Sequence, residues 1–525
     1  MKDLPTGIGT FSNLIENNYL YVDKTEYIHR MAKPSKKFFL SRPRRFGKSL
    51  LVSTLEELYK GNKKLFEGLY IYDKWNWSKK FPVIHIDFGK LSYKTSDELK
   101  RSLNLFLNRT AKLNNIELDE TDLITDKFAE LIEEISLKNN SKVVVLIDEY
   151  DKAILDNIND LTLVEDIRYE LNKFYGALKT DKFLEFVFIT GISKFTKTSI
   201  FSGLNNVTDL TLHPDFVNIC GYTQKDLETH FKEYLTDFSE DNDISCDDLL
   251  VLIKDWYDGY SWDGYNTVYN PYSILSLFGT GRFSNYWFET GTPTFLMNFI
   301  KNDDVDVNTL LDSNPVFSGD FPNFDLENLD FMTVLLQTGY LTIKNQDYVV
   351  GELPNYTLGI PNREVHDSLY TRILSYYTKA STNVIPSLVK KISEGIVNAD
   401  ENVLQESFEL LIANIPYSLY KNVKEDVREA NFHMMILSWL RLLGFDIQGE
   451  ILTFKGRVDA ILKKDNRVVV CEIKYSSDKS LDKMIDDALG QIKDTEYYKP
   501  FVDRNVLLLA VAIRDRDVKC KIEHL

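Results

Sequence analysis

The stretch KFFLSRPRRFGKSL, from Lys37 to Leu50, decides the fold of the N-terminal part of this chain. Its Phe38-Phe39-Leu40 segment has the apolar pattern of a short buried strand. Beyond the stretch, one face of a helix is marked by Leu51, Leu55 and Leu58. The sequence therefore predicts a strand, a tight loop and a helix in succession, which is the arrangement of a phosphate-binding loop.

The loop carries the groups that phosphate binding needs. Gly47 lets backbone N–H groups point inward at the helix N-terminus, Lys48 reaches the outer phosphates, and Ser49 supplies a hydroxyl for Mg²⁺. The pattern G-x-x-x-x-G-K-[ST] begins with glycine, whereas this chain has Arg42, so we expect the start of the loop to be shaped differently. We assign Arg45 to the nucleotide site. The alternative is that the arginines of the loop form a solvated basic edge.

A second motif, KVVVLIDEYD from Lys142 to Asp151, supports this interpretation. Its apolar run is what a parallel strand covered on both faces requires, and open α/β sheets bind ligands at the carboxyl ends of such strands. There Asp148 can hold Mg²⁺ through water, and Glu149 can orient and deprotonate the attacking water. The two motifs together predict a site that hydrolyses a nucleotide.

Further strands and helices predict a layered α/β/α domain. Strands are expected at Pro82–Phe88 and at Phe186–Ile189, and the second is followed by Thr190 and Ser193. Either hydroxyl could sense the terminal phosphate, although a polar cap after a strand is common. Helices are expected between the strands, at 97–107, 125–137 and 163–178.

The middle of the chain, from about 216 to 390, changes character. Thr223 and Asp226 have capping-box spacing ahead of a helix, and aromatic residues are dense throughout. The densest patch runs from Trp256 to Tyr265. It can be interpreted as a clamp that stacks on bases, or as the packed core of a hairpin with glycine turns.

The C-terminal stretch from Gly456 to Lys474 predicts two strands joined by a turn at Asp465-Asn466. With a two-residue loop, Asp459 faces Glu472, and Lys474 lies on the same face. Opposed Cβ atoms lie about 5 Å apart, so the two carboxylates would repel by about 3 kcal/mol at an effective dielectric near 20. We expect a positive group between them.

A divalent metal with oxygen ligands is one such group, and Lys474 would then polarise or deprotonate a water beside it. A structural pair bridged by the lysine is the alternative. Upstream, Glu429 and His433 lie four residues apart on one predicted helix face, so a third carboxylate is available. Downstream, the stretch from Ala488 to Lys493 begins a second predicted helix, whose Gln491 and Lys493 could touch a substrate.

Charge restricts the partners of the chain. The 525 residues include 62 basic and 79 acidic side chains, a net charge of -17, which argues against a surface that coats nucleic acid indiscriminately. Residues 421–525 differ, with 19 basic and 18 acidic residues. If a polyanion is bound, this C-terminal part repels it least.

The length suggests about three domains, and other features indicate the compartment. The four cysteines include no C-x-x-C pair, which favours a reducing environment over disulfides or structural zinc. The N-terminus lacks the apolar segment of a signal peptide, and the longest apolar run, Val506–Ile513, is too short for a membrane span. We expect a soluble, cytoplasmic protein with no membrane contact.

Several motifs together resemble a known family: Leu4–Gly9, Tyr19–Thr25, Arg42–Ser49, Tyr269–Pro271, Tyr286-Trp287, Thr290–Pro293 and Gln337–Leu341. They are similar to those of bacterial AAA-ATPase-like proteins with a C-terminal PD-(D/E)XK nuclease-superfamily domain. The resemblance covers the whole chain and implies ATP and Mg²⁺ as cofactors. In that family the loop usually lacks its first glycine, so Arg42 is compatible with ATP. The nuclease pattern maps Glu429 to the helical acid, Asp459 to "D" and Glu472-Ile473-Lys474 to "E-x-K".

We therefore expect an α/β multidomain chain. Its predicted parts are a P-loop NTPase α/β/α domain at 1–215, a helical middle or lid domain at 216–390, and a restriction-endonuclease-like α/β domain at 391–525. The predicted function is an ATPase coupled to a Mg²⁺-dependent nuclease that acts on nucleic acid, with DNA as first candidate, in defence or control of mobile elements. The alternatives are an NTP-dependent switch whose C-terminal domain only binds DNA or a protein, and a nucleotide-sensing scaffold without nucleic acid. The sequence is compatible with an oligomer and does not define one.

Overall fold

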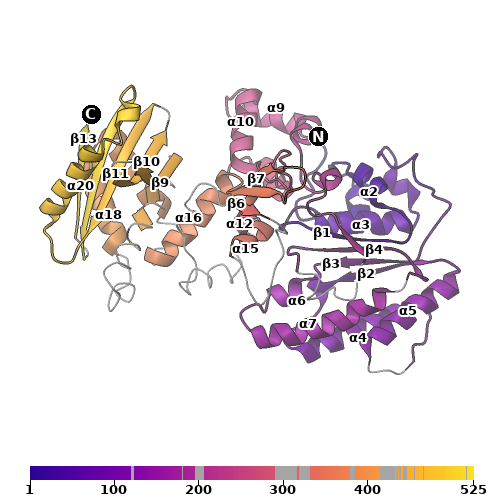
Figure 1. Ribbon diagram of the computed structural model, residues 1–525. Helices are drawn as coiled ribbons and strands as arrows, with labels where there is room; N and C mark the ends of the chain where they lie inside the picture. The colour runs from indigo at the N-terminus through magenta and orange to yellow at the C-terminus, as the bar shows by residue number, and fades with distance from the viewer. Residues whose placement is uncertain are drawn as a thin grey trace. The chain divides into compact units, whose positions relative to one another are not determined.

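The computed structural model divides the chain into two compact units (Figure 1). The first comprises Met1–Phe295 and Val316–Glu364, and the second comprises Leu296–Pro315 and Val365–Leu525. The structure describes residues 1–119, 123–179, 181–195, 206–289, 316–318, 331–378, 385–413, 432, 435–436, 439–440, 446–453, 456–464, 466–515 and 517–525.

A five-stranded parallel sheet lies at the centre of the first unit, with strand order β2-β3-β4-β1-β5. Its strands are β1 (Lys36–Ser41), β2 (Val83–Asp87), β3 (Val143–Asp148), β4 (Leu184–Gly191) and β5 (Val207–Asp209). Every residue of β3 is buried, as expected for a strand covered on both faces. Because all strands run in the same direction, the carboxyl ends of β1 and β3 open onto one edge of the sheet.

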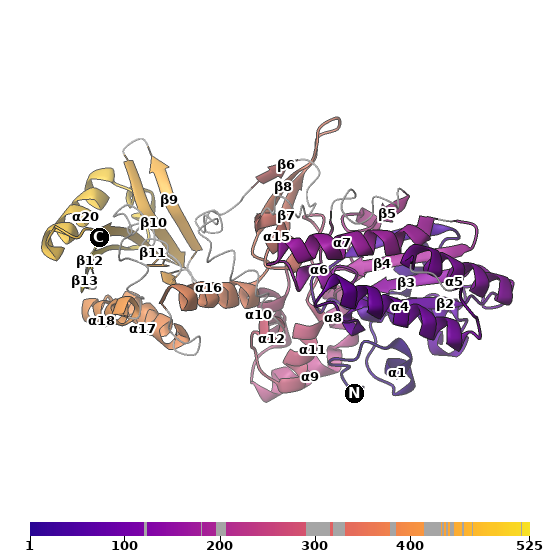
Figure 2. The ribbon, with the colours of Figure 1, turned by 90° about the horizontal axis from the view of Figure 1, so that it is seen from below.

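Helices cover both faces of this sheet, so the predicted α/β/α layering is observed (Figures 1 and 2). One face carries three helices in contact with one another: α4 (Ser96–Leu113), α5 (Ile124–Asn139) and α7 (Leu161–Gly176). They are the three helices that the apolar spacing predicts. The remaining helices of this region are α1 (Phe11–Glu16), α2 (Thr25–Met31), α3 (Lys48–Tyr59) and α6 (Lys152–Leu155).

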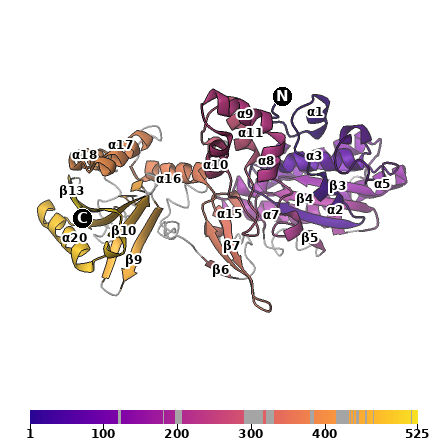
Figure 3. The same cartoon turned by 90° about the horizontal axis from the view of Figure 1, so that it is seen from above.

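The middle of the chain contributes further helices to the first unit: α8 (Gln224–His230), α9 (Lys232–Asp241), α10 (Cys246–Tyr257), α11 (Pro271–Thr280), α12 (Tyr286–Glu289) and α15 (Phe331–Thr338). Helices α8 to α11 pack around a shared apolar cluster (Figure 3). The capping box predicted for Thr223 and Asp226 is present at the start of α8.

This region also contains a small sheet that the sequence analysis did not anticipate. Its strands pair in the order β6-β8-β7, and they are β6 (Val316–Ser318), β7 (Thr342–Asp347) and β8 (Asn355–Gly359). Only the first two residues of β7 are buried, so the strand shows no sustained alternation of apolar and polar residues. The middle of the chain, which was expected to be helical, therefore also contains strands.

The second unit contains a mixed five-stranded sheet in the order β13-β12-β11-β10-β9. The strands are β9 (Asp446–Thr453), β10 (Gly456–Lys464), β11 (Arg467–Tyr475), β12 (Asn505–Arg514) and β13 (Asp517–His524). Helix α20 (Leu481–Thr495) buries its apolar face against one side of the sheet. The other helices are α16 (Arg363–Thr378), which begins in the first unit, α17 (Ile385–Asn398) and α18 (Glu401–Ala413).

The interactions of Asp226 at the N-terminus of α8 are expected to contribute to the stability of the first unit. Asp226 accepts the backbone N–H of Thr223 at 2.8 Å and pairs with the half-buried ammonium of Lys24 at 2.7 Å. Asp226→Ala removes both interactions, so we expect a loss of roughly 2 kcal/mol in urea unfolding. Asp248→Ala is the matched control, because Asp248 holds the same capping position in α10 but is exposed, and it should lose about 0.5 kcal/mol. Equal losses would contradict a role for the Lys24 pair.

Candidate functional site

The loop between β1 and α3 closes around the ammonium group of Lys48. Its Nζ donates to the carbonyl oxygens of Arg42 and Pro43, at 2.9 Å each. Burial lowers the pKa of Lys48, and the nearby carboxylate of Asp148 acts in the opposite direction. Gly47 caps α3 with a φ of +89°, a left-handed conformation that residues with a Cβ rarely adopt. The lysine and the helix N-terminus are thus brought together, as phosphate binding requires.

Ser49 and Asp148 meet at the carboxyl edge of the sheet. The carboxylate of Asp148 is only 3% exposed, and the hydroxyl of Ser49 is near enough to influence it. Burial raises the pKa of Asp148, while the Ser49 hydroxyl and the Lys48 ammonium lower it. A hydroxyl and a carboxylate side by side form an oxygen ligand set of the kind that Mg²⁺ prefers, so these residues fit that ion.

Glu149 follows Asp148 directly and remains accessible. Its backbone has a φ of +52°, its N–H donates to Asp148 Oδ1 at 2.9 Å, and its side chain is 39% exposed. Gly89 makes room for it, because a Cβ there would lie 2.6 Å from Glu149 Oε2. The carboxylate of Glu149 is therefore available to solvent at the same edge as Lys48, Ser49 and Asp148.

The two hydroxyls expected to sense phosphate are bonded to protein acceptors. Thr190 Oγ1 donates to the carbonyl of Leu40 at 2.8 Å and is fully buried. Ser193 donates through both its N–H and its hydroxyl to Asp151, which also accepts the N–H of Ile192. Asp151 thereby ties the end of β3 to the segment after β4. The role of Thr190 in nucleotide binding stays a prediction.

The arginines of the loop have different environments. Arg42 is 1% exposed, and burial lowers its pKa to about 10. Its guanidinium lies 3.9 Å from the ring centroid of Trp262 and donates to the carbonyls of Ser41, Thr211 and Phe216. Arg42 therefore packs in the interior and does not belong to a solvated edge. Arg45 is exposed above the ring of Tyr272, and its contact with phosphate stays a prediction.

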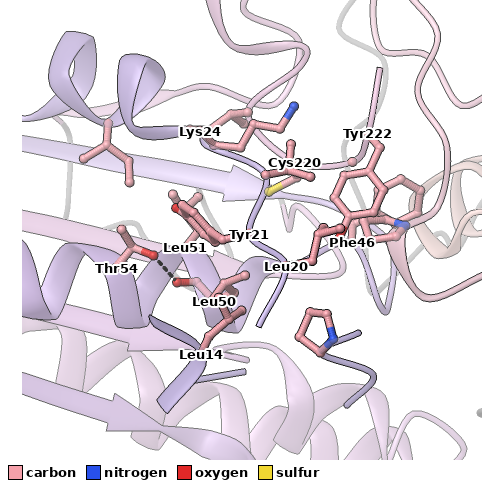
Figure 4. Close-up of a pocket in the computed structure, with 17 residues that line it drawn as sticks. Leu14, Leu20, Tyr21, Lys24, Phe46, Leu50, Leu51, Thr54, Cys220 and Tyr222 are labelled. Carbon is pink, nitrogen blue, oxygen red and sulfur yellow. Dashed lines mark hydrogen bonds between the residues drawn. The ribbon is translucent and has the colours of Figure 1, made fainter. Parts of the chain in front are cut away.

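An open, mostly apolar pocket lies beside the loop (Figure 4). Most of its lining comes from the N-terminal residues around Tyr21, the loop and helix around Gly47, and the residues around Cys220, and Pro271 completes it. Thr54 donates its hydroxyl to the carbonyl of Leu50 at 2.8 Å, and burial raises the pKa of the Tyr21 phenol. Burial also raises the pKa of the Cys220 thiol, which is not in a disulfide. Apolar walls with few polar groups suit a flat heterocycle.

In the second unit, the hairpin of β10 and β11 has the predicted register. Lys464 pairs with Arg467, and the ladder continues to Ala460 and Cys471, one step short of Asp459 and Glu472. Beyond the pair of Ala460 and Cys471, hydrogen bonds to the two carboxylates take the place of backbone pairing between the strands. Asp459 Oδ2 accepts the N–H of Ile473 at 2.7 Å, and Glu472 Oε2 lies 3.4 Å from the N–H of Asp459.

Both carboxylates lie on the face of the sheet that α20 covers. Side chains alternate between faces, and Ile461 and Val470, two residues from Asp459 and Glu472, belong to the cluster that packs against α20. Asp459 is 7% exposed and Glu472 is 1% exposed. The two acids are thus close together and buried on one face, as a shared metal requires.

Lys474 supplies a positive group at this face. Its Nζ donates to Glu472 Oε1 and to Gln491 Oε1, at 2.7 Å each. Burial and the charge of Asp459 nevertheless raise the pKa of Glu472 to about 7. Two buried carboxylates of which one readily keeps a proton fit a divalent cation, which would take the place of that proton.

Part of the predicted site is not described. Glu429 and His433 lie outside the described residues. Within the described part of the chain, no group of three or more His, Cys, Asp or Glu side chains has the geometry of a metal site. Asp459 and Glu472 are accordingly the acids of this face that the structure brings together.

Comparisons with known proteins identify two domains in the chain. Residues 5–201 match a family model described as "Predicted AAA-ATPase", and residues 427–524 match a model of the PD-(D/E)XK nuclease superfamily. A protein of Azotobacter chroococcum mcd 1, described as "Uncharacterized protein in vnfD 5'region", is 34% identical over 500 residues, which cover 94% of this chain and 93% of that protein. The chain belongs to the family of predicted AAA-ATPases with a C-terminal PD-(D/E)XK nuclease-superfamily domain.

The family's two matched domains contain the two sites described above. Lys48 and Asp148 fall in the predicted AAA-ATPase domain, and Asp459 and Glu472 fall in the nuclease-superfamily domain. The segment between the two matches includes most of the middle helices of the first unit. None of the helices in the described residues is both long and apolar enough to cross a membrane.

Sequence reasoning missed some residues of the candidate site in the first unit. Asp151 was visible as the third acid of the D-E-Y-D motif, but nothing in the sequence showed that it binds the segment after β4. Tyr21 and Cys220 line the pocket from segments about 200 residues apart, and apolar spacing gives no signal for such a pairing. Gln491, which was expected near the substrate, is bonded to Lys474.

The raised pKa of Glu472 predicts how pH affects the metal-free protein. Between the ordinary value of 4.5 and about 7, the folded chain holds a proton on Glu472 that the unfolded chain releases. Stability in EDTA should therefore fall as pH rises from 5 to 7 and then level off. Glu472→Gln should flatten this profile in urea unfolding, whereas Glu523→Gln, which changes an ion-paired carboxylate on β13, should retain it. An unchanged slope in Glu472→Gln would contradict the assignment.

Proposed function

We propose that this chain binds and hydrolyses ATP at the edge of the first sheet, and that its C-terminal domain cleaves nucleic acid, with DNA as first candidate. The observation that supports ATP hydrolysis best is the convergence of Lys48, Ser49 and Asp148, with the accessible Glu149 beside them. Their types and positions match the needs of phosphoryl transfer to water.

Each residue of this edge has a proposed task. The loop N–H groups and Lys48 bind the phosphates, and Ser49 and Asp148 hold Mg²⁺, which neutralises the charge of the outer phosphates when bound. Glu149 orients a water and accepts its proton, because it is the exposed carboxylate at this edge that is adjacent to Asp148. Arg45 and Thr190 remain proposed contacts of the nucleotide.

We propose that the apolar pocket binds the base of the nucleotide. It adjoins Gly47, so a nucleotide with its phosphates in the loop would have its base within reach of the pocket. Cys220 and Tyr222 form the wall that comes from the chain just before α8. We propose on this basis that the middle of the chain acts as a lid over the nucleotide.

In the C-terminal domain, Asp459 and Glu472 would hold Mg²⁺, which supplies positive charge next to the scissile phosphate when bound. Lys474 is placed to polarise the attacking water, since its ammonium bonds to Glu472 and Gln491 and is 28% exposed. Glu429 is the proposed third acid. Because Asp459, Glu472 and Lys474 are all present, cleavage of nucleic acid is favoured over binding alone. The alternative is an NTP-dependent switch whose C-terminal domain binds nucleic acid or a protein without cleaving it.

Two substitutions test ATP hydrolysis. Lys48→Ala should abolish ATP binding, whereas Glu149→Gln should keep binding and lower kcat by about 100-fold or more, because only the second removes the proposed general base. Titration calorimetry and phosphate release on the full chain measure the two effects. Lys60→Ala, which removes an exposed ammonium at the far end of the same helix, is the control. Wild-type turnover in Glu149→Gln would overturn the assignment.

Cleavage is tested on single- and double-stranded DNA and on RNA, with Mg²⁺ or EDTA and with or without ATP. Lys474→Ala should retain Mg²⁺ binding and lose cleavage by about 100-fold, because only the group that polarises water is removed. Glu472→Gln should lose both. Lys479→Ala, an exposed lysine of the same domain, should behave as wild type. Nucleic-acid binding without Mg²⁺-dependent cleavage in the wild-type chain would instead support the switch.

A further inference from the structure

The residues of the nucleotide loop from Arg42 to Phe46 are contacted one by one by the middle of the chain, within the first unit. These contacts are of several kinds, and they involve Trp262 with Arg42, Gly339 with Pro43, Trp287 with Arg44, Tyr272 with Arg45, and Tyr260 and Trp262 with Phe46. Most are ring or packing contacts with side chains. The contact of Trp287 differs, because its indole Nε1 donates to the backbone carbonyl of Arg44 at 3.1 Å.

That hydrogen bond determines the direction of a peptide group in the loop. In a planar trans peptide the C=O and the N–H point in opposite directions. When the carbonyl of Arg44 is directed to Trp287, the N–H of Arg45 is directed to the opposite side, away from the indole. Arg45 has a φ of +67°, which accommodates this turn. A backbone N–H that is held in one direction is the kind of group with which a phosphate-binding loop contacts its ligand.

Trp287 is itself held in place from two sides. It is 6% exposed, and its ring packs edge-on against Tyr340, with centroids 5.4 Å apart. Gly339 has a φ of +93°, and a Cβ there would lie 2.8 Å from Pro43 and 3.2 Å from the Trp287 ring, so glycine lets the three groups approach.

The backbone of Trp287 is bonded to a buried carboxylate. Its N–H donates to Glu364 Oε1 at 2.6 Å, and Glu364 Oε2 accepts the hydroxyl of Ser273 at 2.7 Å. Glu364 is fully buried and is the second residue of α16. The residues of α16 from Val365 onward belong to the second unit.

We propose that Trp287 and Glu364 are positioning residues of the nucleotide site. Trp287 orients the peptide between Arg44 and Arg45 for phosphate, and Glu364 holds Trp287 in the position from which it does so. Because binding linkage is reciprocal, a phosphate that fixes this peptide also stabilises the first turn of α16, through the same two hydrogen bonds. This inference rests on the proposed nucleotide function.

The test uses the full chain and ATP in titration calorimetry. Trp287→Phe keeps an aromatic ring and removes the N–H, so we expect ATP to bind about tenfold more weakly, as the loss of one hydrogen bond near 1.4 kcal/mol implies. Trp77→Phe is the matched control, because the indole of Trp77 donates to the carbonyl of Tyr72 at 2.7 Å away from the loop, and it should keep the wild-type Kd.

A second measurement separates positioning from stability. In the wild-type chain ATP should slow hydrogen exchange at residues 363–369, and in Trp287→Phe this protection should be lost even at saturating ATP. Glu364→Gln should weaken ATP binding severalfold, and it carries the test if Trp287→Phe does not fold. Wild-type affinity in either folded variant, or protection of 363–369 that survives in Trp287→Phe, would overturn the inference. If the wild-type chain itself fails to bind ATP, the proposed nucleotide function fails instead.

Discussion

The buried guanidinium of Arg42 is the interaction on which the form of the first unit depends most. It lies at the end of β1, where a phosphate-binding loop usually has glycine, and it bonds to the carbonyls of Thr211 and Phe216, which lead toward the middle helices. Trp262 covers its outer face. Burial of a charge costs free energy unless hydrogen bonds compensate for it, and the buried Nε of Arg42 has no such partner in the described part of the chain. Removal of either set of partners would therefore leave Arg42 in a still less favourable environment. The loop and the middle of the chain are therefore held together by the same side chain.

This arrangement explains why the loop does not need its first glycine. The backbone turns at Arg45 and Gly47, both with positive φ, while Arg42 anchors the start of the loop from inside. The aromatic patch that the sequence left open between a base clamp and a core is buried at Tyr257, Tyr260 and Trp262. Two of these rings pack against Phe46, so in this structure the patch acts as a wall of the loop.

In the second unit the buried charges that need compensation are negative. Asp459 and Glu472 repel one another in a buried place, and the chain compensates with the N–H of Ile473, the ammonium of Lys474 and a raised pKa of Glu472. Each compensation is partial, because a single lysine neutralises only one of two charges. A site that remains short of positive charge in the folded state is well suited to a divalent cation.

The sequence by itself determined the local elements: the loop between β1 and α3, the acids at the end of β3, the capping box of α8 and the register of the β10–β11 hairpin. These depend on residues close together in the chain, where helical and strand periodicity and turn length decide the geometry. Only the tertiary structure decided that Arg42 faces Trp262, that Trp287 bonds to the carbonyl of Arg44, and that Gln491 bonds to Lys474. Such contacts join segments far apart in the sequence, and hydrophobic periodicity specifies which face of an element is buried but not which distant side chain meets it.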